Sequence, residues 1–219
     1  MSNETRDRIV EAAFRLAAEK PWAEITLAAI AQGAGLNLAE LAQQISGKPD
    51  ILDAFARGMD ARLLASLKDD PVEGDAHDRL FDIILRRFEL LAPYKAAIAN
   101  IAKAPADGPA EWLALLASAL VTQGWMLAAA DIQLSGAKGD VAKLGLAKIQ
   151  ADTLRVWLKD DDSGLARTMA ALDRKLRDGE ALIKRLETPI AVCSGIARVF
   201  RSLREERTSS KTQAHDTAD

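Results

Sequence analysis

The chain has 219 residues, enough for one or two compact domains, and its 49% hydrophobic and 28% charged residues are ordinary for a soluble globular protein. The net charge of −3 excludes a bulk attraction to nucleic acid or anionic lipid, and only a local patch would provide one. A single cysteine excludes an internal disulfide, and two isolated histidines leave no His/Cys cluster, so we expect no metal and no cofactor.

The N-terminal residues predict short helices in close succession. Apolar residues at helical spacing predict a first helix over residues 5–19, and its charged start has no signal-peptide core, which favours a cytoplasmic location. Thr26 is suited to cap a second helix, because its hydroxyl accepts a free amide of the first turn. Gly33 and Gly35 are expected to form the turn, and Asn37 to cap a third helix.

A fourth helix is expected over residues 48–67, followed by a polar segment at 69–75 that marks a domain boundary. Strand periodicity is missing, so the chain is predicted to be all-α with about nine helices. The later helices are expected at 77–91, 94–103, 111–130, 141–159, 164–186 and 190–207, with residues 135–139 separating two of them. The predicted domains are 1–68 and 75–207, with a disordered tail at 208–219.

One stretch requires a test for membrane insertion. From Trp112 to Ala130 there are 19 residues without a charge, close to the length that spans a bilayer. Six of them are alanine, and polar residues interrupt the run. We therefore expect a central helix buried on most sides of a soluble bundle.

The first 67 or so residues resemble the TetR family of transcriptional regulators. The matching residues are IVEAA at 9–13, Thr26, IA at 30–31, AGLN at 34–37, ISGK at 45–48 and IL at 51–52. The resemblance implies a TetR-like fold whose third helix enters the major groove of operator DNA and whose fourth helix opens with a phosphate-binding lysine. The DNA-binding residues that it implies are Thr26, Asn37, Leu38, Glu40, Gln43, Gln44 and Lys48.

The same segment departs from the family in sequence and charge. Ala42 stands where the family usually has a tyrosine, and the amides of Gln43 and Gln44 are suited to adenine edges. Residues 1–68 hold eight Lys/Arg and nine Asp/Glu, a net charge of 8 − 9 = −1, and no Lys or Arg lies between positions 21 and 47. DNA affinity depends on phosphate neutralisation, so the alternative is a subdomain that has kept its fold and lost its DNA site. A positive rim from Arg6, Arg8 or Lys20 would restore the DNA interpretation.

The region from residue 125 to 186 is similar to a second family, the accessory lipid-binding proteins of ubiquinone biosynthesis, which share the TetR-like fold. The matching pieces are GLA at 145–147, WL at 157–158, DDS at 161–163, TMA at 168–170 and LDRKL at 172–176. This resemblance implies an isoprenoid lipid in a helical cavity, no catalysis, and an amphipathic C-terminal helix at membranes.

The last predicted helix, 190–207, has two sharply different faces. Its basic residues and its apolar residues lie on opposite sides: Arg198, Arg201, Arg204 and Arg207 against Ile196, Val199, Phe200 and Leu203. Such a helix suits peripheral contact with an anionic membrane, or it packs at a dimer or core seam with a solvated basic stripe. The TetR resemblance implies that helices 164–186 and 190–207 form the seam of a homodimer.

Seven residues of the C-terminal half are candidates for lining an apolar ligand region, although each also suits an ordinary core. They are Phe81, Phe88, Tyr94, Trp112, Trp125, Met126 and Trp157. The acids at 160–162 are best explained as a helix N-cap run. No catalytic motif is present, so an enzyme is not expected.

The sequence therefore predicts a TetR-type, ligand-responsive transcriptional regulator that binds operator DNA as a homodimer. The alternative is a non-enzymatic lipid- or isoprenoid-binding accessory protein that does not bind DNA. The first rests on the helix-turn-helix spacing, and the second on the missing cations and the C-terminal resemblance. The partners expected are operator DNA and an apolar small molecule or lipid.

Overall fold

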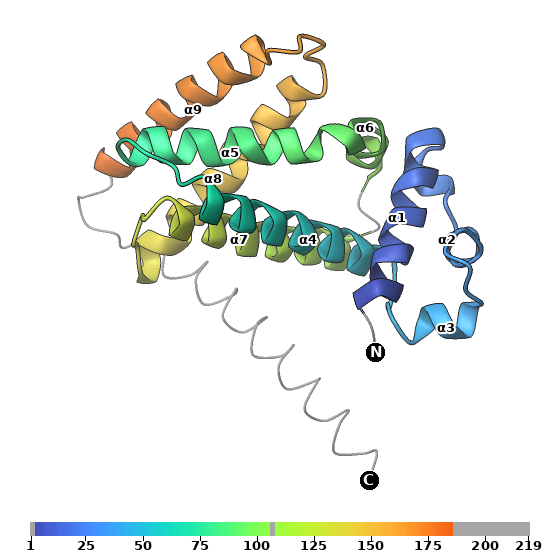
Figure 1. Ribbon diagram of the computed structural model, residues 1–219. Coiled ribbons are helices and arrows are strands. Elements are labelled where there is room, and N and C mark those ends of the chain that lie inside the picture. The colour runs from blue at the N-terminus through green and yellow to red at the C-terminus, as the bar shows by residue number, and fades with distance from the viewer. Residues whose placement is uncertain (1–2, 106–107, 186–219) are drawn as a thin grey trace.

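The structure, a computed structural model, describes residues 3–105 and 108–185 (Figure 1). Within these ranges all regular elements are helical, so the all-α prediction is confirmed. The α-helices are α1 (Asn3–Glu19), α2 (Leu27–Gly33), α3 (Leu38–Ala42), α4 (Lys48–Asp69), α5 (Ala76–Leu91), α6 (Lys95–Lys103), α7 (Pro109–Ala129), α8 (Gly136–Trp157) and α9 (Ala166–Arg185). The 3₁₀ helices η1 (Trp22–Glu24) and η2 (Ala92–Tyr94) precede α2 and α6. The predicted helix 190–207 and the tail 208–219 lie outside the described residues.

The first three helices close around a small core. Ile9 and Ala13 of α1 are fully buried, because their i, i+4 spacing places them on one face of the helix. Ile30 of α2 and Leu41 of α3 join the same buried cluster, as does Ile45 just beyond α3. Except for Leu41, these residues are among those that match the family resemblance, so the motif largely coincides with the packing of this unit.

α4 belongs to both halves of the molecule. It packs against α1, α5 and α7, and in Figure 1 it runs from the N-terminal helices along the length of the bundle. Phe55 and Leu63 are both buried along its length. α1 also packs along α6, where the side-chain amide of Asn100 donates to the carbonyl oxygen of Ala17 at 2.9 Å. The N-terminal helices are therefore fixed to the bundle at α4 and at α6.

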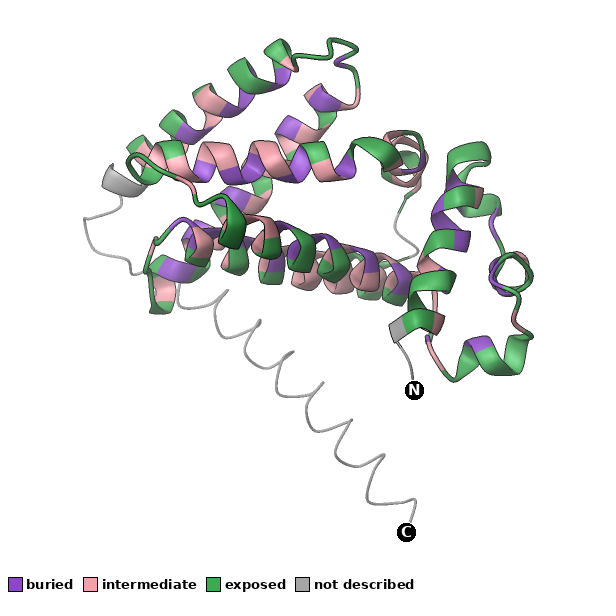
Figure 2. Ribbon diagram, in the orientation of Figure 1, coloured by how far each residue is buried: buried purple, intermediate pink, exposed green. Residues whose placement is uncertain are grey.

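The C-terminal bundle surrounds the continuation of the same apolar core. α8 packs against both α7 and α9, while α5 packs against α7 and α9. Phe88, Met126, Trp157 and Leu172 are among its largest fully buried side chains. Figure 2 shows these helices with buried residues on their inward faces and exposed residues on their outer faces. The outermost described helix, α9, is buried on one face only.

α8 begins earlier than predicted. Residues 135–139 were expected to separate two helices, but the helix starts at Gly136. Gly139 is buried inside its second turn, and a Cβ there would lie 2.6 Å from the carbonyl oxygen of Leu134. This glycine therefore allows a close approach of two backbone segments and does not mark a loop. The expected separator was wrong for that reason.

α7 is much less buried than predicted. Of the described helices, α7 is the one whose length and composition would suffice to cross a membrane. Only 22% of its most apolar 18-residue stretch is buried. Its buried residues are Thr122, Gln123, Met126 and Leu127, all in its C-terminal half. Val121 and Trp125 are 50% and 53% exposed. The expectation of a helix buried on most sides is wrong, because α4, α5 and α8 cover only one side of it.

Candidate functional site

α2 and α3 are joined by a tight turn whose geometry follows from local side chains. The Thr26 hydroxyl caps α2 by accepting the amide N–H of Ala29 at 3.1 Å, and Asn37 caps α3. Between the helices, Gly35 has a φ of 67°, a left-handed conformation that costs glycine little. These three predictions are confirmed. Gly33, in contrast, is the last residue of α2 and not part of the turn.

The predicted DNA-contacting residues lie along one stretch, from the start of α2 to the start of α4. Five of them are exposed, namely Thr26, Asn37, Leu38, Glu40 and Gln43, while Gln44 and Lys48 are half-buried. α3 ends at Ala42, so Gln43 is its C-cap and Gln44 follows it. The structure therefore presents a short helix with Leu38, 56% exposed, and Gln43 as side chains directed to solvent.

The acidic residue of this surface has a structural function. The side-chain oxygen of Asn37 accepts the amide N–H of Glu40 at 2.9 Å, and the Glu40 carboxylate accepts the amide N–H of Asn37 at 2.8 Å. This reciprocal capping box satisfies two amides that a helix start would otherwise leave unpaired. The carboxylate is thereby held against the first turn of α3.

Lys48 points back into the protein. Its ammonium donates to the carbonyl oxygens of Trp22 at 2.8 Å and Ile25 at 3.2 Å, and it lies 5.0 Å from the centroid of the Trp22 ring. These contacts tie η1 and the start of α2 to the start of α4. Two of the three ammonium donors are thus used inside the protein, which leaves one for a phosphate.

Three arginines of α1 supply the cations that α2 and α3 lack. Arg15 donates to the carbonyl oxygen of the last residue of α2 at 2.9 Å, Arg8 donates to carbonyl oxygens of the turn, and Arg6 donates to that of Gln44 at 3.4 Å. All three are exposed, and Lys20 is exposed just after α1. Arg6, Arg8 and Lys20 were the expected rim residues. Arg15 was missed, although its i+7 spacing from Arg8 places both on one face of α1.

The seven residues predicted to line a ligand region are not gathered at one place. Phe88 and Trp157 lie together with ring centroids 5.4 Å apart, and Met126 is fully buried in the same core cluster, with Phe81 packed against it. Trp112 and Trp125 are more than half exposed on α7. Tyr94 packs edge-on against the rings of Phe14 and Phe55. Only part of the set therefore remains as a candidate lining.

An open groove of about 430 Å³ lies beside Trp157. It is lined by Glu89, Ala92, Lys95, Trp157, Asp160, Asp161, Asp162, Ser163 and Leu165. Asp160 accepts from the amide and hydroxyl of Thr168, and the Thr168 hydroxyl is the main reason that the pKa of this carboxyl is lowered. Asp162 accepts the amides of Gly164 and Ala166. The acidic run therefore organises the start of α9, as predicted.

The interior of the bundle contains a polar cluster that was not predicted. Asp60 of α4 forms an ion pair with Arg87 of α5 and accepts the hydroxyl of Thr122 of α7 at 2.8 Å. Both charged side chains are less than 9% exposed, and burial lowers the pKa of Arg87. Arg87 Nε and the Gln123 side-chain oxygen are buried without a hydrogen-bond partner. This cluster joins the three helices around the bundle interior.

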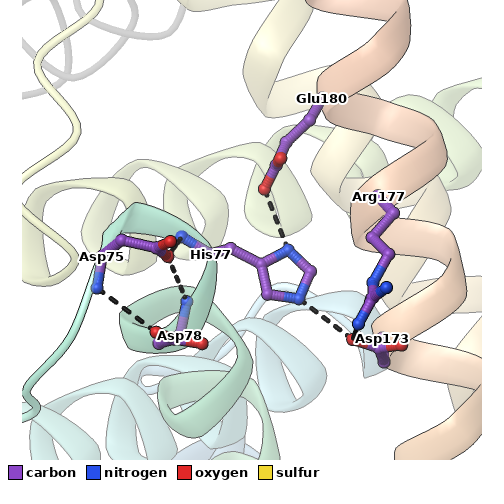
Figure 3. Close-up of polar contacts among 6 residues, drawn as sticks. All are labelled: Asp75, His77, Asp78, Asp173, Arg177 and Glu180. Carbon is purple, nitrogen blue, oxygen red and sulfur yellow. Dashed lines mark hydrogen bonds and ion pairs between the residues drawn. The ribbon is translucent and has the colours of Figure 1, made fainter.

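A second polar contact links α5 to α9. His77 Nδ1 lies 2.9 Å from Glu180, and His77 Nε2 lies 3.1 Å from Asp173, which also binds Arg177 (Figure 3). Burial lowers the pKa of His77, but the two carboxylates outweigh it and the pKa lies above its ordinary value. The carboxylates face different ring nitrogens, and among the described residues no group of three His, Cys, Asp or Glu side chains is placed to hold a metal ion.

Comparison with known proteins identifies the fold. No protein-family model and no curated protein matches the sequence. The structure is similar to the TetR transcriptional regulator from Nitrosomonas europaea ATCC 19718, with a TM-score of 0.64 over 80% of this chain and 98% of that one, at 22% identity. It is also similar to a TetR transcriptional regulator from Rhodococcus sp. RHA1, with a TM-score of 0.60 over 80% and 95% of the two chains, at 18% identity.

The protein therefore has the TetR-like all-α fold that its N-terminal motif predicted. At these identities the likeness concerns the fold. The similarity of residues 125–186 to the ubiquinone-biosynthesis family is tested by neither structure and stays a prediction.

Proposed function

We propose that the protein is a TetR-type transcriptional regulator that binds operator DNA as a homodimer in the cytoplasm and responds to an apolar ligand in its C-terminal bundle. The observation that carries the proposal is the surface of α3, which is exposed, capped at its start and bordered by three arginines of α1. This surface belongs to a fold that two TetR regulators share.

The arginines answer the electrostatic objection raised by the sequence. A guanidinium has five donors, and the carbonyl contacts of Arg6, Arg8 and Arg15 use one or two of them, so the others can bind phosphate. Together with Lys20, these residues provide four cations beside α3 in each copy. In a homodimer the number doubles, which reaches the roughly 6–10 phosphate contacts typical of sequence-specific DNA binders.

Regulation would follow from a dimer with two conformations. The two copies of α3 must match half-sites about 34–36 Å apart to occupy successive major grooves. A ligand that binds the bundle more tightly in the other conformation shifts the population away from this spacing. α4 packs on α7 and on α1, α1 packs on α2, and α2 contacts α3, so a change in the bundle can reach α3 through α4, α1 and α2.

The proposal is tested by binding of DNA fragments from upstream of the gene at several salt concentrations. Gln43→Ala should weaken binding to the preferred site by about 1–3 kcal/mol, since it removes a base contact, and leave the salt dependence unchanged. Arg6→Ala should weaken binding to all sequences and reduce the salt slope by about 1. Lys159→Ala, an exposed cation beyond α8, is the matched control and should do neither. Absence of retardation for every fragment at low salt would reject the proposal.

The second candidate is a lipid- or isoprenoid-binding accessory protein that does not bind DNA. Two observations favour it: the Lys48 ammonium is bound to carbonyl oxygens, and α7 exposes Trp112 and Trp125. Mass spectrometry of the purified protein tests this candidate, because the absence of any co-purifying lipid or isoprenoid, together with no vesicle binding, would count against it. Flotation with anionic vesicles tests the accompanying prediction of peripheral membrane contact.

A further inference from the structure

The outward face of α7 is an exposed apolar stripe. Val121, Trp125 and Ala128 are all exposed, and their i, i+4, i+7 spacing places them in one line along the helix. They lie opposite the side that buries Met126 and Leu127. From residue 112 to residue 129 the helix has no charged side chain. Exposed apolar surface of this extent in a water-soluble bundle indicates a surface that another apolar element covers.

The outward surfaces of α8 and α9 have a different chemistry. Asp152 of α8 binds Lys148 at 2.8 Å, Arg155 at 2.7 Å and Lys175 of α9 at 3.2 Å. Lys148 and Arg155 are mostly exposed. These two helices therefore present a charged surface to solvent, and in the described part of the chain the apolar stripe with exposed tryptophan belongs to α7.

The chain leaves the described region near one end of this stripe. Glu180, in the last turns of α9, contacts His77 at the start of α5 (Figure 3), and Arg79, two residues further along α5, donates to the carbonyl oxygen of Ala130 at 2.9 Å. Ala130 directly follows α7. The C-terminal ends of α9 and α7 therefore lie at the same end of the bundle, and 219 − 185 = 34 residues follow α9.

The sequence that follows α9 has an apolar pattern that complements the exposed stripe of α7. Val192, Ile196, Val199 and Leu203 are spaced i, i+4, i+7, i+11, which makes an apolar stripe, with arginines on the opposite side. As a helix, residues 190–207 would be about 27 Å long, close to the roughly 31 Å of α7. A helix of this kind can cover the uncharged stripe while its arginines stay in water.

We propose that residues 190–207 bind as a helix along the exposed face of α7 in the same chain, antiparallel to α7, and cover Val121 and Trp125. The direction follows from the starting point, because a segment that begins at the C-terminal end of α7 can cover the helix only by running toward its N-terminus. In this register Cys193 lies beside Trp125, while Trp112 lies near the far end of the segment.

A tethered segment has an advantage over a second copy of the chain. Its effective concentration at a site on its own chain is in the millimolar range for a short linker. A second copy at micromolar concentration would need a correspondingly tighter contact with the same stripe. This proposal differs from the prediction that residues 190–207 form a dimer seam, and it does not depend on DNA binding.

The native cysteine allows a direct test in the full-length protein. Cys193 is the only cysteine, so a bimane fluorophore, which tryptophan quenches on contact, can be attached there specifically. We expect strong quenching that persists on dilution and is relieved severalfold by Trp125→Phe. Trp112→Phe, the matched control, should leave it unchanged. Equal fluorescence in all three proteins, or relief only by Trp112→Phe, would overturn the proposal.

A disulfide cross-link shows, without a bulky label, whether the stripe of α7 is covered by the same chain, by a second copy or by a membrane. Oxidation of the Trp125→Cys variant should join positions 125 and 193 within one chain, giving a species of monomer size on a non-reducing gel. Ala151→Cys, on the exposed side of α8, is the control and should not form it. A dimer-sized product would overturn the proposal in favour of a second copy. If the 125–193 cross-link forms in solution and is lost when anionic vesicles are added, the proposal is supported. If no such cross-link forms in solution and the segment contacts only vesicles, the proposal is overturned in favour of a membrane.

Discussion

The buried ion pair between Asp60 and Arg87 is the single contact with the largest expected effect on stability. Removing one member leaves a buried charge without its partner, which typically costs about 3–5 kcal/mol. Asp60→Asn should therefore lower the melting temperature by roughly 6–20 °C, at about 2–4 °C per kcal/mol for a chain of this size. The hydrogen bond from Thr122 is weakened in the same variant. Calorimetry and urea unfolding measure the change.

The control for this prediction is Asp69→Asn, which removes an exposed carboxylate from the same helix and should change stability by less than about 0.5 kcal/mol. The double variant Asp60→Leu/Arg87→Met removes both charges and should recover most of the loss, because apolar replacements of a buried pair are often neutral. A double variant as unstable as Asp60→Asn would show that the cost is steric and not electrostatic.

His77 should make stability depend on pH. Burial lowers the pKa of His77, but its hydrogen bonds to Glu180 and Asp173 raise it above the unfolded value overall. The folded state thus binds the proton more tightly, and the resulting stability is present below about pH 6.5 and lost as the pH rises through the raised pKa. The two partners are 43% and 38% exposed, so we expect an effect on the order of 0.5–1 kcal/mol.

The measurement compares melting temperatures of the wild type and His77→Gln across pH. The difference should be larger at about pH 5.5 than at about pH 8.5, on either side of the ordinary histidine pKa. Asp75 and Asp78, the other acids at the start of α5, are present in both proteins and cancel in the difference. A difference that does not change with pH would contradict the ion-pair interpretation.

For contacts between individual residues, the sequence predicts those close along the chain and misses those between distant positions. Thr26 and Asn37 were identified as caps because each bonds an amide three residues away. The contacts of Arg8 with the turn span 26 residues or more, and that between Arg87 and Asp60 spans 27. Spacing along one helix carries no information about such pairs, so the carbonyl contacts of the α1 arginines and the buried cluster required the structure.

The turn between α2 and α3 is the element whose geometry is most sensitive to substitution. Gly35 has a φ of 67°, and a Cβ there would lie 3.0 Å from a guanidinium nitrogen of Arg8. Gly35→Ala should destabilise the protein by about 1–2 kcal/mol, the usual cost of a left-handed conformation for a residue with a Cβ. It should also weaken the proposed DNA binding, because the turn sets the angle of α3.

For Gly58 we expect that substitution by alanine stabilises the protein, the opposite of the effect expected at Gly35. It is exposed in the middle of α4 and a Cβ there would meet nothing within 4 Å. Gly58→Ala should stabilise the protein by about 0.5–1 kcal/mol, since glycine is unfavourable in a helix interior. Urea unfolding of both variants gives the comparison. Similar changes of the same sign would mean that the backbone of Gly35 is less constrained than its φ indicates.

Helix boundaries were predictable where capping chemistry is local. A helix was predicted over residues 77–91, and the observed helix begins one residue earlier, at Ala76, after the Asp75 cap. Gly139 was wrongly placed in a segment that separates two helices. The sequence alone does not distinguish a glycine that ends a helix from one that permits a close approach of two backbone segments. The exposure of α7 was also not predictable, since an apolar run in the sequence does not show which other helices pack against it.

The arrangement of the whole molecule makes the N-terminal helices dependent on the bundle. The rings of Phe14 in α1 and Phe55 in α4 stack with centroids 3.8 Å apart, and Tyr94 at the end of η2 meets both edge-on. Asn100 of α6 adds a hydrogen bond to α1. The predicted boundary near residue 69 divides the sequence by polarity, whereas packing links α1 to α6 and α4 to α7 across it.

This linkage predicts that the two halves unfold together in the wild type and separately once Tyr94 is truncated. Hydrogen exchange followed by mass spectrometry should give one free energy of opening for α1 and α8 in the wild type. In Tyr94→Ala, α1 should open at about 1–2 kcal/mol less than α8, because an aromatic pair contributes about 0.5–1.5 kcal/mol beyond the area it buries. Tyr94→Phe keeps the ring and should behave as the wild type. An equal decrease in both helices would mean that the two halves still unfold as one cooperative unit without the Tyr94 ring, and it would contradict the prediction.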